Sequence, residues 1–162
     1  ALRGFGIREH IKLDCSGKIL SGFHIFRAMA LGADFTNCAR AMMMALGCIQ
    51  ALECNKNTCP VGVATQDPYF AKGLVVEDKK ARVANYHKHT VDSLVELLSS
   101  TGLDSPAKIN RTHVYRRVFM NMVKTYAEIY PPIPEGCLLD QADSPIEFDA
   151  YLNQAKAESF GT

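Results

Sequence analysis

Three cysteines, Cys48, Cys54 and Cys59, lie within twelve residues of one another, and Pro60 follows the last of them. Thiols gathered this closely in a sequence generally bind a metal, form a disulfide or carry out redox chemistry, and an odd number argues against simple pairing. Iron–sulfur clusters are held by cysteine thiolates, and a Cys-Pro ending occurs in one class of cluster-binding sequence. The three cysteines therefore indicate a three-iron cluster, or a cluster whose fourth ligand comes from elsewhere in the protein.

Other kinds of cysteine site remain open. A zinc site with three cysteines needs a fourth ligand, and the nearest histidines, His87 and His89, lie about thirty residues further along the chain. A catalytic cysteine needs one thiol and a base, which leaves the two neighbouring thiols unexplained. Three unrelated buried cysteines are a third alternative, although buried cysteines do not usually cluster in a polar loop.

The elements that must position these residues form an alternating series. Short apolar segments at 11–15 and 33–38 indicate strands, and the segments 20–31 and 39–52 predict helices from their apolar spacing or their Ala, Met and Leu content. Strand and helix in alternation form a βαβα unit, which implies parallel strands and a right-handed crossover. We expect Cys48 on the last turns of the second helix, with the cysteine loop after it.

Small and basic residues follow each predicted strand: Ser16, Gly17 and Lys18 after the first, and Cys38, Ala39 and Arg40 after the second. Such loops let backbone N–H groups approach an anion, and the dipole of the helix that follows adds to the attraction. In (β/α)8 barrels the loops after strands seven and eight frequently form a phosphate site. On spacing alone, an ordinary pair of turns between strand and helix is the simpler interpretation.

The rest of the chain is predicted to be helical, with helices at 77–101, which Gly102 ends, at 106–128, and at 145–158, with Ser144 as N-cap and Pro145 at the first helical position. We therefore divide the chain into two parts. Residues 1–68 hold the βα units and the cysteine loop, and residues 69–162 form a C-terminal helical extension.

Bulk composition narrows the function classes. A chain of 162 residues with 48% apolar and 22% charged residues has the size and composition of one globular domain. A formal net charge of +1 gives no electrostatic reason to expect nucleic acid or an anionic membrane as partner. No stretch approaches the roughly 20 apolar residues that span a bilayer. Six cysteines without a secretory signal point to a reducing compartment, so we expect a cytoplasmic protein.

Five segments together resemble the FMN-binding domain of the glutamate synthase family, and in particular its short members that lack the amidotransferase domain. They are Ser16-Gly-Lys-Ile-Leu-Ser-Gly22, Ala30-Leu-Gly-Ala-Asp34, Ala39-Arg-Ala-Met42, Leu46-Gly-Cys-Ile-Gln50 and Cys54-Asn-Lys-Asn-Thr-Cys-Pro-Val-Gly-Val-Ala-Thr-Gln66. The likeness is densest over residues 7–68, and the cysteine segment is its most specific part.

The resemblance implies a (β/α)8 TIM barrel with FMN at the carboxyl ends of the strands and a [3Fe-4S] cluster nearby. Carried over residue by residue, it makes Cys48, Cys54 and Cys59 the cluster ligands. It places Ser16, Gly17 and Lys18 at the FMN phosphate in the loop after strand seven, and Cys38, Ala39 and Arg40 there in the loop after strand eight. Large glutamate synthases have an acidic-glycine-glycine sequence in the first of these loops and more glycine in the second, so the implied contacts here are those of backbone amides.

The resemblance also implies an activity, the reductive amination of 2-oxoglutarate to glutamate through 2-iminoglutarate, with electrons that pass from the cluster to FMN. A closed barrel of this kind needs about 250 residues, and only two barrel strands are predicted here. We therefore expect the chain to be the C-terminal portion of a larger enzyme. Its expected partners are the remaining part of the barrel, an electron donor protein or subunit, and a small substrate. An electron-transfer module without catalysis, and a zinc-stabilised structural domain, are the alternatives.

Overall fold

The computed structural model describes residues 1–158 and contains two compact units. The larger unit comprises residues 13–126 and is an α/β structure that includes all nine predicted site residues. The smaller unit combines residues 1–12 with the described residues from 127 onward. The functional boundary predicted after residue 68 stays a prediction. No helix of the described chain has the length and apolar character needed to cross a membrane.

Two short parallel strands form the sheet of the larger unit. Strand β1 (Asp14–Ser16) pairs with β2 (Phe35–Asn37), and helix α1 (Gly22–Ala30) connects them. The side chain of Asp34 accepts a hydrogen bond of 2.8 Å from the Leu13 N–H, which closes the sheet at its other end. The predicted parallel pairing is therefore confirmed, although both strands are shorter than the segments 11–15 and 33–38.

Helix α2 (Ala39–Leu46) ends six residues before its predicted end at residue 52, and Cys48 follows the helix instead of lying on its last turns. The cause is Gly47, whose φ of 107° places it in the left-handed region that glycine adopts without strain. The Cys48 N–H donates to the Met43 carbonyl at 3.0 Å and completes the helix end. One glycine thus ends a helix in a segment that is otherwise rich in good helix formers.

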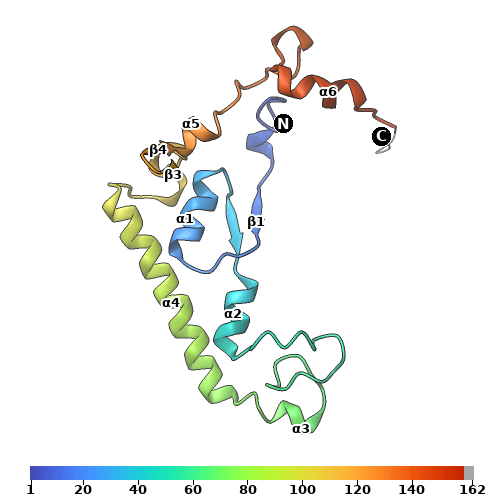
Figure 1. Ribbon diagram of the computed structural model, residues 1–162, viewed down its shortest axis with the longest axis vertical. Helices are drawn as coiled ribbons and strands as arrows, with labels where there is room; N and C mark the ends of the chain where they lie inside the picture. Colours follow the sequence, from blue (N-terminus) through green and yellow to red (C-terminus); the bar gives the residue numbers. More distant parts are fainter. Residues whose placement is uncertain (159–162) are drawn as a thin grey trace. The chain divides into compact units, whose positions relative to one another are not determined.

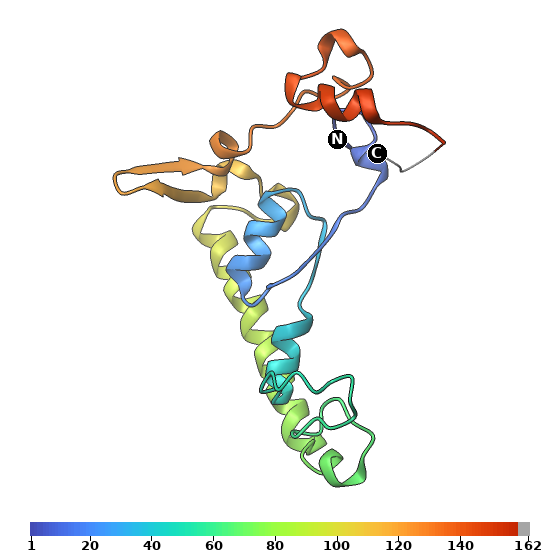
Figure 2. The same ribbon diagram turned by 45° about the vertical axis from the view of Figure 1, so that its right-hand side comes forward.

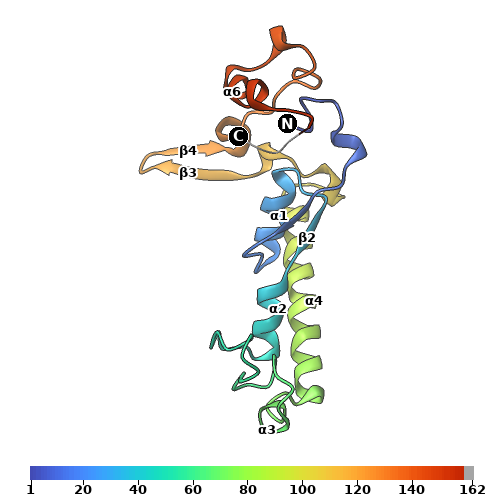
Figure 3. The same ribbon diagram turned by 90° about the vertical axis from the view of Figure 1, so that its right-hand side faces the viewer.

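The long helix α4 (Val76–Ser100) agrees with the prediction of 77–101 to within one residue at each end. It packs against both α1 and α2, and Figures 1 and 3 show it running alongside them. The contact with α1 is close at Gly22, where an added Cβ would lie 2.5 Å from the Leu94 nitrogen. A short helix that the sequence did not predict, α3 (Pro68–Ala71), precedes α4, and the Asp67 side chain caps it.

The helix predicted at 106–128 is wrong. The structure has two single-turn 3₁₀ helices, η2 (Pro106–Lys108) and η3 (Arg111–His113), then an antiparallel hairpin of β3 (Tyr115–Phe119) and β4 (Met122–Thr125), and the short helix α5 (Tyr126–Ile129). Figure 2 shows this hairpin projecting from the helices of its unit. The strands contain β-branched and aromatic residues such as Tyr115, Val118 and Val123, which favour strands over helices.

The smaller unit is held by backbone hydrogen bonds between its two chain segments. The Gly136 N–H donates to the Arg3 carbonyl at 3.1 Å, and the Leu138 N–H donates to the Gly4 carbonyl at 2.8 Å. Besides irregular chain, the unit contains the 3₁₀ helices η1 (Arg8–His10) and η4 (Gln141–Asp143) and the helix α6 (Ile146–Gln154). The terminal helix predicted at 145–158 is thus shorter, and Pro145, not Ser144, is its N-cap.

Candidate functional site

The two loops with phosphate-type sequences leave the same edge of the sheet. Ser16 is directly opposite Asn37 in the parallel register, so both strands end at one level. The carboxyl ends of parallel strands are where α/β proteins bind their ligands. The structure therefore brings the segments 16–18 and 38–40 to a common edge, as a shared phosphate site requires.

The loop after β1 turns back sharply. Gly17 and Lys18 both have positive φ values, of 98° and 57°, and Lys18 adopts the left-handed region without being a glycine. After this turn Ile19 enters the interior, where its side chain is 4% exposed. Ser16, Gly17 and Lys18 remain exposed on the turn itself. Their backbone amides are thus open to a ligand while the next residue anchors the loop.

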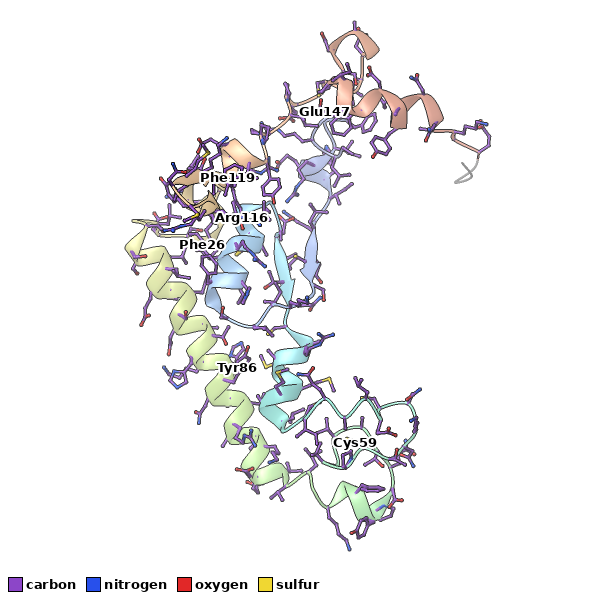
Figure 4. All side chains as sticks on the ribbon, in the orientation of Figure 1. Phe26, Cys59, Tyr86, Arg116, Phe119 and Glu147 are labelled. Carbon is purple, nitrogen blue, oxygen red and sulfur yellow. The ribbon has the colours of Figure 1, made fainter. Side chains whose placement is uncertain are left out.

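Two side chains tie this loop to the rest of the unit. The thiol of Cys38, at the N-cap of α2, donates to the Ile19 carbonyl at 2.9 Å. The hydroxyl of Tyr86, from the middle of α4, donates to the Leu20 carbonyl at 2.8 Å and lies 3.7 Å from the Cys38 sulfur. Figure 4 shows Tyr86 on the side of α4 that faces α2. Desolvation, and secondly the hydrogen bond with Cys38, raise the pKa of Tyr86 above its usual value.

A cleft of about 720 Å³ opens beside these contacts. Its lining comes from the ends of both strands and from α1, α2 and α4: Ser16, Ile25, Thr36, Asn37, Cys38, Ala39, Met42, His87, Thr90 and Val91. Three of the six residues predicted to contact FMN, Ser16, Cys38 and Ala39, therefore border one cleft. Gly17, Lys18 and Arg40 are not part of its lining.

The cysteine loop between α2 and α3 is held mainly by its own polar residues. The Glu53 carboxylate accepts hydrogen bonds from Lys56 and Thr58, and the Asn57 side chain accepts one from the Gln66 N–H at 2.6 Å. Three residues of the loop that are not glycine have positive φ values: Gln50, Leu52 and Asn57. A positive φ is uncommon outside glycine and indicates strain. The loop thus holds an irregular path through short-range contacts.

The thiol of Cys59 differs from the other two in its surroundings. It is buried, with 6% of its surface exposed, and Figure 4 shows it inside the folded loop. Hydrogen bonds from four successive backbone amides, the strongest from Ala64 and the others from Val61, Val63 and Gly62, lower its pKa. Backbone amides that converge in this way favour an anion. The loop therefore favours the thiolate form of Cys59, the form that binds metals, more than water favours it in a free cysteine.

The three sulfurs are not gathered into one coordination group. No cluster of three or more His, Cys, Asp or Glu side chains close enough to hold a metal ion is present among the described residues. Cys54 is exposed, Cys48 is half-buried and accepts a hydrogen bond of 3.4 Å from the Gln50 N–H, and Cys59 is buried. By donor chemistry the set suits an iron–sulfur cluster, because it offers three free thiols close together in the sequence and the pKa of one of them, Cys59, is lowered.

Comparisons with known proteins identify the family. The family described as "Conserved region in glutamate synthase" matches residues 1–104, a range that includes both sheet-edge loops and the three cysteines. The chain belongs to the glutamate synthase family. It is 47% identical over 116 residues to the glutamate synthase large subunit-like protein YerD of Bacillus subtilis (strain 168), a match that covers 72% of this chain and 22% of that protein.

Two relatives of lower sequence identity are also glutamate synthases. The chain is 39% identical over 104 residues to the archaeal glutamate synthase (NADPH) of Methanocaldococcus jannaschii, which covers 64% of this chain and 20% of that protein. It is 32% identical over 128 residues to ferredoxin-dependent glutamate synthase 1, chloroplastic/mitochondrial, of Arabidopsis thaliana, which covers 74% of this chain and 7% of that protein. The chain thus corresponds to about a fifth of the length of the first two relatives.

Sequence reasoning missed two residues of α4 that reach the sheet edge. Tyr86 was not among the predicted site residues, and His87, considered above only as a distant zinc ligand, lines the cleft. Helical periodicity indicates which face a residue occupies, but it does not indicate which carbonyl a hydroxyl will reach. The sequence contained no signal that pairs Tyr86 with Leu20.

Proposed function

We propose that this chain is the C-terminal part of the FMN-binding (β/α)8 barrel of a glutamate synthase-type oxidoreductase. The reaction proposed for the whole protein is the reduction of 2-iminoglutarate, formed from 2-oxoglutarate and ammonia, to glutamate. The observation that carries the proposal is the parallel register of β1 and β2, because it puts two phosphate-type loops at one sheet edge within a chain of this family. The chain's small share of its relatives' length supports its being one portion of such a barrel.

The residues proposed to hold the FMN phosphate are the six at the sheet edge: Ser16, Gly17, Lys18, Cys38, Ala39 and Arg40. The exposed turn formed by Gly17 and Lys18 presents backbone amides and an ammonium group, and Arg40 adds a guanidinium at the start of α2. Phosphate is bound well by such amides at helix N-termini and by positive side chains. The side chains thereby supply positive charge, and the backbone N–H groups supply hydrogen bonds in fixed directions.

Cys48, Cys54 and Cys59 are the proposed ligands of a [3Fe-4S] cluster. The amides around Cys59 stabilise a thiolate there, and hydrogen bonds to cluster sulfurs also tune the reduction potential. When bound, FMN supplies hydride transfer and the cluster supplies one-electron transfer. This chain's residues bind and orient those groups. Residues that contact the flavin ring and the 2-oxoglutarate are proposed to come from the remainder of the barrel.

The other partners follow from the same proposal. An electron donor protein or subunit must supply electrons, because the reduction consumes two for each glutamate formed. The cytoplasm is the proposed setting, since thiols intended for a cluster must stay reduced and all six cysteines are free in the structure.

The test is to analyse the full-length protein after anaerobic purification. We expect one FMN, three iron atoms and acid-labile sulfide per chain, and an electron paramagnetic resonance signal from the oxidised protein. With a chemically reduced electron donor, 2-oxoglutarate and ammonium, the protein should form glutamate. Zinc without sulfide would contradict the cluster, and iron and sulfide without flavin would indicate an electron-transfer module.

A further inference from the structure

We propose that Tyr86 is a positioning residue that fixes the phosphate-binding loop through the Leu20 carbonyl and Cys38, and so gives the protein its preference for a phosphorylated flavin. This inference rests on the proposed flavin site and adds to it a residue that touches no part of the flavin. Tyr86 lies in the middle of α4, 66 residues from Leu20 in sequence. A contact of that range is made by the fold and not by local turn geometry.

The two tethers set the direction of the loop's amides. All peptide bonds of the described chain are trans, so each carbonyl points opposite to the N–H that follows it in the same peptide plane. The Ile19 carbonyl accepts from Cys38 and the Leu20 carbonyl accepts from Tyr86. The N–H groups of Leu20 and Ser21 must therefore point away from Cys38 and Tyr86. They precede α1 directly, where the helix dipole attracts an anion.

Tyr86 makes hydrogen bonds through both its backbone carbonyl and its side chain. Its own carbonyl accepts a hydrogen bond of 2.8 Å from the hydroxyl of Thr90, which is buried. Its hydroxyl bridges the loop after β1 and the N-cap of α2, because it contacts Leu20 and Cys38 together. One hydroxyl group thus joins the two loops that the phosphate must contact at the same time. Its removal frees the first loop to turn its amides elsewhere.

The experiment compares FMN with riboflavin, which has the same ring system and lacks the phosphate. Full-length protein stripped of flavin is titrated with each compound, and the dissociation constants are obtained from flavin fluorescence. Tyr86→Phe removes only the hydroxyl. We expect it to weaken FMN binding by about three- to tenfold, the value of one hydrogen bond, and to leave riboflavin binding unchanged. Tyr69→Phe, at an exposed tyrosine of α3, is the matched control and should leave both constants unchanged.

The ratio of the two constants separates positioning from general stability. A merely structural role for Tyr86 would weaken both flavins equally, and that result, like no change at all, would overturn the inference. If Tyr86→Phe does not fold, Cys38→Ala removes the second tether and should lower the FMN-to-riboflavin preference in the same direction. Wild-type protein that binds FMN no better than riboflavin would overturn the proposed phosphate site and, with it, the role of Tyr86.

Discussion

The sheet edge and the cysteine loop are built in opposite ways. Contacts between distant parts of the chain hold the sheet edge: Tyr86 reaches Leu20, and Cys38 reaches Ile19. The side-chain hydrogen bonds of the cysteine loop join residues at most nine apart, and its three sulfurs remain separate. Under the proposed function, the fold itself would shape the edge for the FMN phosphate, whereas cluster binding would have to bring the three thiols of the loop together.

The two regions should differ in how much conformational entropy the chain loses when a ligand binds. A site that the fold already orders costs little further entropy when its ligand binds. A site that the ligand must assemble uses part of the metal's binding free energy to order the chain, so metal binding and local folding are coupled. Removal of the proposed cluster should therefore disorder the cysteine loop and leave the sheet edge intact.

The largest effect expected is the loss of iron from a cysteine variant. Cys54→Ser removes the most exposed of the three proposed thiolate ligands, and the hydroxyl is a poor substitute for it. We expect nearly complete loss of iron and sulfide from the purified full-length protein, together with faster cleavage of the loop in limited proteolysis. FMN content should fall far less. Cys15→Ser, at a thiol of β1 outside the proposed cluster, is the control, and full iron in Cys54→Ser would contradict the assignment.

Next in size is the effect of a methyl group at Gly62, which has a φ of 77° and packs against α3. In Gly62→Ala the new Cβ would lie 2.5 Å from the Phe70 carbonyl oxygen. Gly102→Ala has a similar φ, of 71°, and open space around it, so it measures backbone strain alone, about 1–2 kcal/mol.

We expect Gly62→Ala to cost about 1–3 kcal/mol more than Gly102→Ala because of this overpacking, as measured by the free energy of unfolding in urea. It should also lower iron content, since Gly62 provides one of the amides around Cys59. Equal costs in the two variants would show that the contact between the loop and α3 relaxes freely.

A similar substitution at the start of α1 should lower the stability of the fold and leave the iron content unchanged. Gly22→Ala places a Cβ 2.5 Å from the backbone nitrogen of Leu94, so α1 and α4 must separate. We expect a loss of about 1–3 kcal/mol in unfolding free energy with unchanged iron content. Ser99→Ala, at an exposed position of α4, should change stability by less than about 0.5 kcal/mol. Loss of iron in Gly22→Ala would show that the two regions are coupled.

The smallest effect concerns pH. The pKa of Tyr86 is raised in the folded protein, so the folded state holds this proton more tightly than the unfolded state does. The stability that this gives is fully present below the ordinary tyrosine pKa of about 10 and is lost as pH rises through the folded pKa. Wild-type protein should therefore lose melting temperature above about pH 10 slightly more steeply than Tyr86→Phe. If the melting temperatures of the two proteins fall equally with rising pH, Tyr86 is not the source of this pH dependence.

The sequence predicted the elements whose signals are local. Apolar spacing and Gly102 located α4, and the alternation of strand and helix was sufficient for the parallel sheet. The segment 106–128 failed because its apolar residues fit a helical period while their β-branched and aromatic side chains favour a hairpin. The end of α2 was missed because Gly47, a strong stop signal, stood within a run of good helix formers.

The residues of the candidate site could be located from the sequence, but the contacts between them could not. The loops and cysteines could be located by residue type, because glycine, cysteine and basic residues have few local reasons to cluster. The link between Tyr86 and Leu20 could not be found, since it exists only after α4 has packed across the loop. The separation of the three sulfurs was also beyond the sequence, because it depends on the path of an irregular loop.

Helix α2 connects the two regions, and under the proposed function its length has a consequence for electron transfer. Its eight residues start directly after Cys38 and end two residues before Cys48. At 1.5 Å per residue, the helix gives a rise of about 12 Å between the sheet edge and the first cysteine. With the proposed groups bound, the length of α2 would help to set the distance between them. Inserting one further helical turn would lengthen the distance between the sheet edge and Cys48 by about 5.4 Å. Under the proposed function, α2 would begin with two residues of the phosphate site, Ala39 and Arg40, and end next to the first cluster ligand, so a longer helix would increase the distance between the two groups and slow electron transfer.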